Sequence, residues 1–191
     1  MKKLVLILGL VSLCLPLGCG SAHVRYDAML TRAENALREG DVERAERVLN
    51  ESFSVAEECG ANTGAGKLLL AEAKLQKGDF STSLVEVNSV LEAGNTDPAT
   101  AARAKEIIGK IAIRQGEFAV AQTHLSGAER TYDSESDRRR VADLIALARG
   151  LTAYSKGDIA VARKYWHSIM DAELRFSIDQ CVQDAASAAK R

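Results

Sequence analysis

The sequence predicts an all-helical protein, and three observations support this fold class. The chain of 191 residues has only two prolines, Pro16 and Pro98, so little interrupts a helix. Its longest stretches are rich in Ala, Leu, Glu and Arg, which lose little side-chain freedom in a helix. A turn of the form Gly-(acidic)-apolar-x-x-small also recurs four times, as expected between paired helices.

The composition is that of an ordinary globular domain, with 47% hydrophobic and 27% charged residues. The formal net charge of −1 argues against nucleic acid as a partner, because duplex binding needs a clustered basic face. The densest basic run, Arg138 to Arg140, directly follows Glu135 and Asp137. We interpret this run as the solvated first turn of a helix.

The N-terminus has the pattern of an export signal. Residues 1–3 are Met-Lys-Lys, and an apolar run from Leu4 to Leu17 follows. That run is shorter than the roughly 20 residues of a membrane span and is typical of a signal-peptide core. We therefore expect residues 1–18 to be a signal peptide.

Residues 15–19, Leu-Pro-Leu-Gly-Cys, resemble a bacterial lipobox, although Pro16 stands where that motif usually has an aliphatic residue. The resemblance implies that Cys19 is the lipidation site and the new N-terminus, followed by a short tether over 19–25. Two alternatives stay open. Residues 20–22, Gly-Ser-Ala, would allow cleavage before His23 and simple secretion, and the apolar run could also be an uncleaved anchor.

The repeated turn gives the rest of the chain its organisation. Its glycines step by 38, 38 and 41 residues and are Gly40, Gly78, Gly116 and Gly157. A small residue precedes each glycine by seven positions: Ala33, Ala71, Gly109 and Gly150. Glycine ends a helix in the left-handed conformation, the acidic residue after it caps the next helix, and the small residues let paired helices approach closely. A further small residue follows each turn: Ala45, Ser83, Ala121 and Ala162.

In these positions the chain resembles the tetratricopeptide repeat family, from about Tyr26 to Met170. The resemblance implies a right-handed α-solenoid of about four helix pairs over 26–176. The repeat is longer than the usual 34 residues, the family's aromatic in the first helix is weak, and its closing proline is missing.

Local signals give the remaining boundaries. Asp97-Pro98 opens the third pair, and residues 133–137 offer caps for the fourth. Ser177-x-x-Gln180 has the form of a capping box and predicts a C-terminal capping helix over 177–191. The alternative is one unbroken helix from Asp158 onward.

The resemblance also implies where a partner binds, because the first helices of such pairs line a concave groove. The groove is expected to be acidic at pair one, mixed at pair three and apolar at pair four. The residues at these positions are Glu34, Arg38, Glu72, Gln76, Arg103, Glu106, Lys110, Arg114, Leu147, Leu151 and Tyr154.

The sequence gives only weak evidence for nucleotide, metal or other ligand binding. Residues 60–67 lack the glycine and hydroxyl positions of a nucleotide-binding loop, and we interpret them as an inter-repeat loop. The three histidines have no metal-ligand spacing, so neither a metal nor another cofactor is expected. Cys59 and Cys181 are expected to be buried, free thiols at opposite ends of the repeats. Tyr165 and Trp166 are expected to pack in the core, with a ligand platform as the alternative.

The sequence thus predicts a non-catalytic protein–protein interaction scaffold of the bacterial cell envelope. Its layout is similar to that of tetratricopeptide lipoproteins that assist outer-membrane protein or pilus secretin assembly. We expect an outer-membrane lipoprotein that faces the periplasm and binds another envelope protein or peptide segment, with no small-molecule substrate. The alternatives are a soluble periplasmic adaptor and an accessory subunit of a cell-wall enzyme.

Overall fold

The fold is entirely helical in the part of the chain that the computed structural model describes, residues 19–94 and 96–188. This confirms the predicted fold class. Within those residues the helices, in chain order, are α1 (Cys19–Arg38), α2 (Val42–Cys59), α3 (Gly64–Lys77), α4 (Phe80–Leu91), α5 (Pro98–Gln115), α6 (Phe118–Glu129), α7 (Glu135–Ser155), α8 (Ile159–His167) and α9 (Ala172–Ala188).

The four repeated glycines end the first helix of each hairpin, as predicted. All adopt the left-handed conformation, with φ of 77° at Gly40, 81° at Gly78, 80° at Gly116 and 82° at Gly157. The aspartate after three of these glycines caps the next helix: Asp41, Asp79 and Asp158 each accept a backbone N–H bond at 3.0–3.1 Å. Glu117 makes no such bond, so the predicted side-chain cap is absent there.

The small residues permit close helix contact, as expected. A Cβ added to Gly109 in α5 would lie 2.5 Å from Cγ of Leu125 in α6. A Cβ on Gly150 in α7 would overlap the indole ring of Trp166 in α8. At both places the side chain of the second helix therefore lies directly on the backbone of the first.

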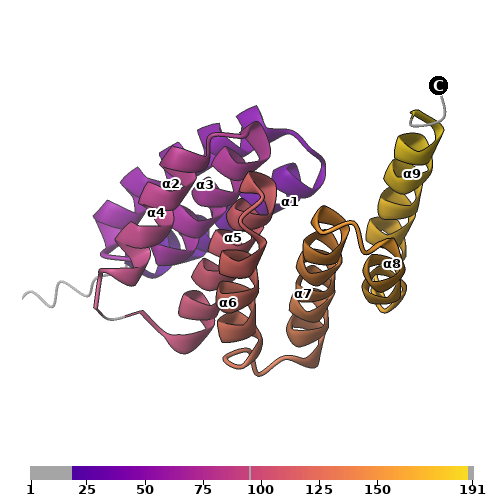
Figure 1. The fold of residues 1–191 in the computed structure, drawn as a ribbon. Helices are drawn as coiled ribbons and strands as arrows, with labels where there is room; N and C mark the ends of the chain where they lie inside the picture. Colours follow the sequence, from indigo (N-terminus) through magenta and orange to yellow (C-terminus); the bar gives the residue numbers. More distant parts are fainter. Residues whose placement is uncertain (1–18, 95, 189–191) are drawn as a thin grey trace, which may run out of the picture.

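Each helix packs against the next in chain order, and α1, α3, α5 and α7 also contact one another in sequence. Figure 1 shows the hairpins following one another across the molecule, from indigo α1 to yellow α9. Buried clusters join successive hairpins. One includes Leu68, Val87 and Ile107 from α3, α4 and α5, and another includes Leu125 and Val141 from α6 and α7.

The beginning of the described chain differs from the prediction. Residues 19–25, expected to be a short tether, form the first turns of α1. Ala22 in these turns packs against the buried cluster of Tyr26 and Val55, which explains why the helix extends this far. Similarly, α3 begins at Gly64, so only the first half of residues 60–67 is a loop. The predicted signal peptide, 1–18, lies outside the described residues.

The C-terminal boundary also differs. The Asp171 carboxylate caps α9, accepting the Leu174 N–H at 2.9 Å, whereas the Ser177 hydroxyl donates to the Glu173 carbonyl inside the helix. The capping box at Ser177 is therefore wrong, and so is the unbroken helix from Asp158. Asp143 of α7 accepts the N–H groups of Met170 and Asp171, both at 2.9 Å, and so holds the chain between α8 and α9 in a bend.

Cys59 has a free thiol but is only half-buried, and the side chain of Cys181 lies outside the described residues. Trp166 is buried and Tyr165 half-buried, as expected for packing side chains.

Candidate functional site

A cavity of about 930 Å³ extends across α1, α3, α5 and α7. Every predicted groove residue except Leu151 and Tyr154 lines it, so the repeat correctly placed these side chains on one side of the molecule. They are Glu34, Arg38, Glu72, Gln76, Arg103, Glu106, Lys110, Arg114 and Leu147. Spacings of three or four residues along each helix explain this, because such residues share a helical face.

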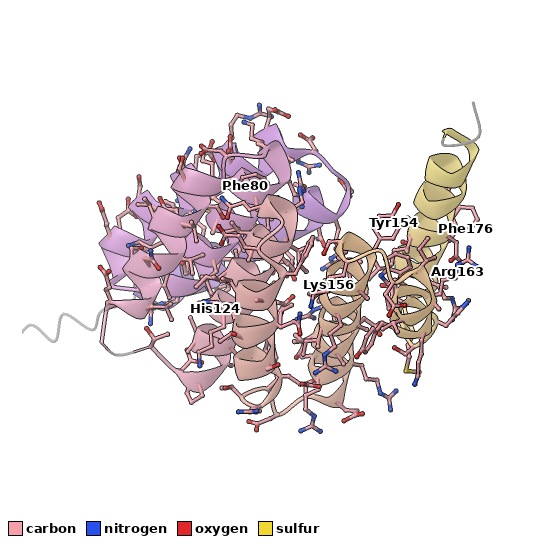
Figure 2. The ribbon with its side chains drawn as sticks, in the orientation of Figure 1. Phe80, His124, Tyr154, Lys156, Arg163 and Phe176 are labelled. Atoms are coloured by element: carbon pink, nitrogen blue, oxygen red, sulfur yellow. The ribbon has the colours of Figure 1, made fainter. Side chains whose placement is uncertain are left out.

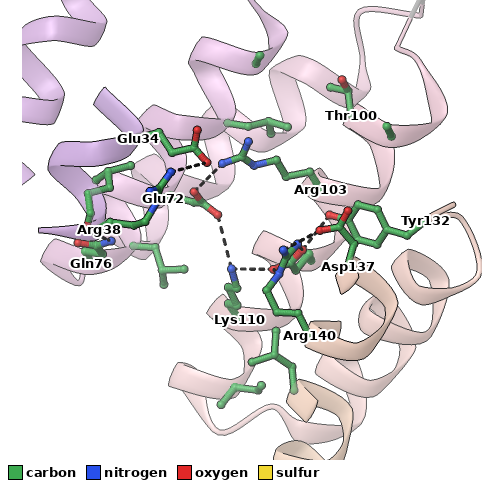
Figure 3. Close-up of a pocket in the computed structure, with 18 of the residues that line it drawn as sticks. Glu34, Arg38, Glu72, Gln76, Thr100, Arg103, Lys110, Tyr132, Asp137 and Arg140 are labelled. Atoms are coloured by element: carbon green, nitrogen blue, oxygen red, sulfur yellow. Dashed lines mark hydrogen bonds and ion pairs between the residues drawn. The ribbon is translucent and has the colours of Figure 1, made fainter. Parts of the chain in front are cut away.

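Most charged side chains of the cavity belong to one connected series, shown in Figure 3, which we call the charge ladder: Arg103, Glu72, Lys110, Glu106, Arg140 and Asp137. Glu72 of α3 lies 3.0 Å from Arg103 and 3.5 Å from Lys110, both of α5. Glu106 lies 2.8 Å from both Lys110 and Arg140, and Arg140 lies 2.7 Å from Asp137. The ladder thus joins α3, α5 and α7.

Glu106 is the buried centre of the ladder, with only 2% of the residue exposed. Besides its two cationic partners, it accepts a hydrogen bond from the Tyr132 hydroxyl at 2.8 Å. Burial alone would raise the pKa of Glu106, but the hydrogen bonds from Arg140 and the charge of Lys110 outweigh it. They lower the pKa from 4.5 to about 2. Glu106 is therefore ionised throughout the physiological pH range.

The Glu106 carboxylate also raises the pKa values of Tyr132 and Arg140. Burial, and then the negative charge of Glu106, raise the pKa of the Tyr132 phenol, so it stays protonated and donates its hydrogen bond. The hydrogen bonds from Arg140 to Glu106 raise the pKa of that guanidinium. The Arg140 guanidinium also lies 5.9 Å from the centre of the Tyr132 ring.

Tyr132, Asp137 and Arg140 also line the cavity, although they are not among the groove residues predicted from the sequence. Arg138 and Arg139 behave as interpreted, since they pair with Glu135 in the exposed first turn of α7. Arg140 instead turns into the cavity. A signal for it was present: counting back from Leu147 by three and then four residues reaches Leu144 and Arg140, which share its helical face and line the cavity.

Leu151 and Tyr154 lie elsewhere. Leu151 packs against the buried cluster of Ala153 and Trp166, and the centre of the Tyr154 ring lies 5.9 Å from that of Trp166. Figure 2 shows Tyr154 near α8 and α9, away from α1–α4. The predicted apolar end of the groove therefore consists of Leu144 and Leu147 with Ile113.

The charges at the α1 end differ from the predicted acidic character. Glu34 and Arg38, both of α1, form an exposed pair at 3.8 Å, so this helix adds one charge of each sign. Beside them, the Gln76 amide donates to the Leu37 carbonyl at 3.4 Å, which links α3 to α1. Arg114 at the end of α5 is different again, because its guanidinium lies 5.7 Å from the centre of the Phe80 ring.

Two further features concern ligands and membranes. In the part of the chain that the structure describes, no group of three or more His, Cys, Asp or Glu side chains is placed to hold a metal ion. No helix in that same part is both long and apolar enough to cross a membrane.

Comparison with known proteins adds no family: no protein-family model, curated protein or solved structure matches this chain.

Proposed function

We propose that this protein is a non-catalytic scaffold that binds another protein of the bacterial cell envelope in the cavity across α1, α3, α5 and α7. The observation that carries the proposal is that cavity itself, to which four successive hairpins each contribute one helix. In this proposal the hairpins are tetratricopeptide-like pairs in a right-handed solenoid with α9 as its C-terminal cap, and the cavity is its concave groove.

The four repeated turns support this arrangement. They give each hairpin the same left-handed glycine, and the close contacts at Gly109 and Gly150 recur at corresponding positions. Consecutive contacts among α1, α3, α5 and α7 are also what a solenoid requires, because each pair buries its apolar face on its neighbours.

The chemistry of the cavity supports binding over catalysis. A general acid or base works best with a pKa near the working pH. Glu106, the buried carboxylate of the cavity, has a pKa of about 2, and its oxygens are occupied by Lys110, Arg140 and Tyr132. Such a carboxylate stabilises the junction between helices and has no proton to exchange near neutral pH.

A partner bound in the cavity can be detected by site-specific photo-crosslinking in the native bacterium. A photoreactive residue replaces Gln76, which is exposed in the cavity, and in a matched control replaces Asn50, which is exposed on α2 outside it. We expect mass spectrometry to find one envelope protein crosslinked at position 76 and not at position 50. The same proteins at both positions, or none at 76, would contradict the proposal.

The envelope location rests on the lipobox-like residues before Cys19. We propose that Cys19 carries lipid and anchors the protein to the outer membrane, facing the periplasm. Cys19→Ser should release the protein from the membrane fraction, and the lipid mass should disappear from the N-terminal peptide. An unchanged fractionation without any lipid mass would favour the alternative, a soluble periplasmic adaptor or an accessory subunit of a cell-wall enzyme.

A further inference from the structure

The charges that line the cavity do not balance. Five basic side chains face four acidic ones. The basic side chains are Arg38, Arg103, Lys110, Arg114 and Arg140, and the acidic ones are Glu34, Glu72, Glu106 and Asp137. Four of the five cations lie within 4 Å of a carboxylate of the cavity. Arg114 has no carboxylate partner among the residues that the structure describes, so it carries the surplus charge.

The surroundings of Arg114 leave its hydrogen-bond donors available. Its guanidinium lies over the ring of Phe80, with 5.7 Å between the guanidinium carbon and the ring centre, and makes no hydrogen bond or ion pair with another described residue. That contact uses the face or edge of a planar cation and takes none of its N–H donors into a hydrogen bond with an oxygen. A guanidinium presents its donors as a fork that matches a carboxylate, so a carboxylate is the group that this position suits.

Aliphatic side chains line the same cavity as Arg114. Ile113 precedes it on α5, and Ile113 and Leu144 are half-buried on the same cluster, with Leu147 one turn further along α7. All four side chains line the cavity. The cavity therefore offers both aliphatic surface and an uncompensated cation, whereas the six charges of the ladder already neutralise one another.

The extent of the cavity fits a chain segment. Packed helices lie about 8–10 Å apart, so the three steps from α1 to α7 cover roughly 25–30 Å. An extended polypeptide advances about 3.3 Å per residue, so eight or nine residues would cross the cavity.

We infer that the cavity binds an extended peptide segment whose aspartate or glutamate side chain pairs with Arg114 and whose neighbouring aliphatic side chain packs on Ile113, Leu144 and Leu147. This inference rests on the proposed function, that of a protein-binding scaffold, and specifies the chemistry of the bound segment.

A displayed random-peptide library tests the inference on the full-length protein in mild detergent. Segments of about twelve residues would be long enough to cross the cavity. Both ends of each segment are fused to carrier sequence, so that only side chains supply carboxylates. Selected segments are then synthesised with amidated ends, and their binding is measured by fluorescence anisotropy.

We expect the selected segments to share an acidic residue beside an aliphatic one. Replacing that acid by its amide should weaken binding about ten-fold or more, as loss of a charge-assisted bond does. Arg114→Gln should weaken the acidic peptide equally and the amide peptide no further, since the two changes remove the same contact. Arg114→Lys should recover part of the loss. Arg149→Gln, on the exposed side of α7 outside the cavity, should leave binding unchanged.

The possible failures are distinguishable. Segments that lose binding in Leu147→Gln but tolerate both the amide and Arg114→Gln would overturn the carboxylate inference and leave the proposed groove function in place. Segments that bind equally well to Leu147→Gln, Arg114→Gln and the native protein would overturn both. The helical content and Tm of each variant, measured beside binding, separate a lost contact from a lost fold.

Discussion

The junctions on either side of α7 each depend on one buried carboxylate, but the two carboxylates have different partners. Glu106 joins α5 to α7 through two cations and a phenol. Asp143, 8% exposed, joins α7 to the α8–α9 connection through two backbone N–H groups. The first carboxylate is held by full charges that are themselves half-buried or exposed, whereas the second is held by neutral dipoles. We therefore expect the stability of the first junction to fall strongly when its charged side chains are replaced and when the pH is lowered.

The two junctions also differ in how completely their large apolar side chains are buried. Toward α5 and α7, Ile107, Leu125 and Val141 are fully buried. From the end of α7 onward, several large apolar side chains stay exposed, among them Tyr154, Ile159, Val161, Met170 and Phe176. Among the described residues, α9 contacts α8, and its Leu174 and Ile178 pack against the cluster of Ala153 and Trp166. The C-terminal hairpin uses the same turn as the others but leaves more of its large apolar side chains exposed, so a shared local motif does not ensure equal packing.

The largest effect is expected at the first junction. Glu106→Ala would leave Arg140, Lys110 and Tyr132 without their shared acceptor and should lower the free energy of unfolding by about 3–5 kcal/mol. Urea denaturation followed by circular dichroism measures this. Glu135→Ala removes an exposed acid that pairs with Arg138 and Arg139, and should cost less than about 1 kcal/mol. Equal losses of unfolding free energy in the two variants would show that the burial of Glu106 adds nothing to stability.

Acid should weaken the first junction. The pKa of Glu106 is about 2 in the folded protein against 4.5 in the unfolded chain. The ionised carboxylate therefore makes its full contribution to the free energy of unfolding above pH 4.5. That contribution, about 3 kcal/mol, is lost as the pH falls from 4.5 toward 2.

Comparison with Glu106→Gln isolates the Glu106 part of this acid effect. Neighbouring groups lower the pKa values of Glu46, Asp79, Asp97 and Glu135 as well, so the native protein loses stability from several carboxylates in this range. The free energy of unfolding of Glu106→Gln should fall less steeply between pH 4.5 and 2. Parallel curves for the two proteins would place the folded pKa of Glu106 near its ordinary value.

The close contacts inside the hairpins should tolerate little added volume. Gly109→Ala would push a methyl group against Leu125 and should cost about 1–3 kcal/mol. Gly127→Ala is the matched control, because its nearest neighbour would be the flexible Lys105 side chain at 3.5 Å. That variant should gain up to about 1 kcal/mol from helix propensity. If Gly109→Ala also gains stability, the α5–α6 contact is looser than described.

The smallest global effect is expected at the second junction. Met170 and Asp171 are exposed, so water can replace Asp143 as acceptor, and Asp143→Ala should cost only about 1 kcal/mol. Hydrogen exchange should nevertheless accelerate in α9 and leave α1–α6 unchanged, since only the α8–α9 bend loses its acceptor. Uniform acceleration along the chain would instead make Asp143 part of the global core.

The sequence could predict the features that depend on local signals. The turns at Gly40, Gly78, Gly116 and Gly157 follow from the residues within them, and the repeat placed nine of the eleven expected groove residues in the cavity. Glu106 was among those residues, but its burial could not be predicted, because its partners Tyr132 and Arg140 lie 26 and 34 residues away. The α9 boundary failed for the same reason: Ser177 offered a local cap, while the bend depends on Asp143, 27 residues before Met170.

Trp166 has a consequence for how unfolding can be observed. It is the single tryptophan of the chain, and its indole lies against Gly150 with the Nε1 hydrogen unpaired among the described residues. Its fluorescence therefore reports on the surroundings of the α7–α8 hairpin, whereas circular dichroism reports on all the helices. The protein thus carries its own optical probe at its least covered end. A fluorescence transition that precedes the loss of helicity would show that the C-terminal hairpin melts before the rest of the helices.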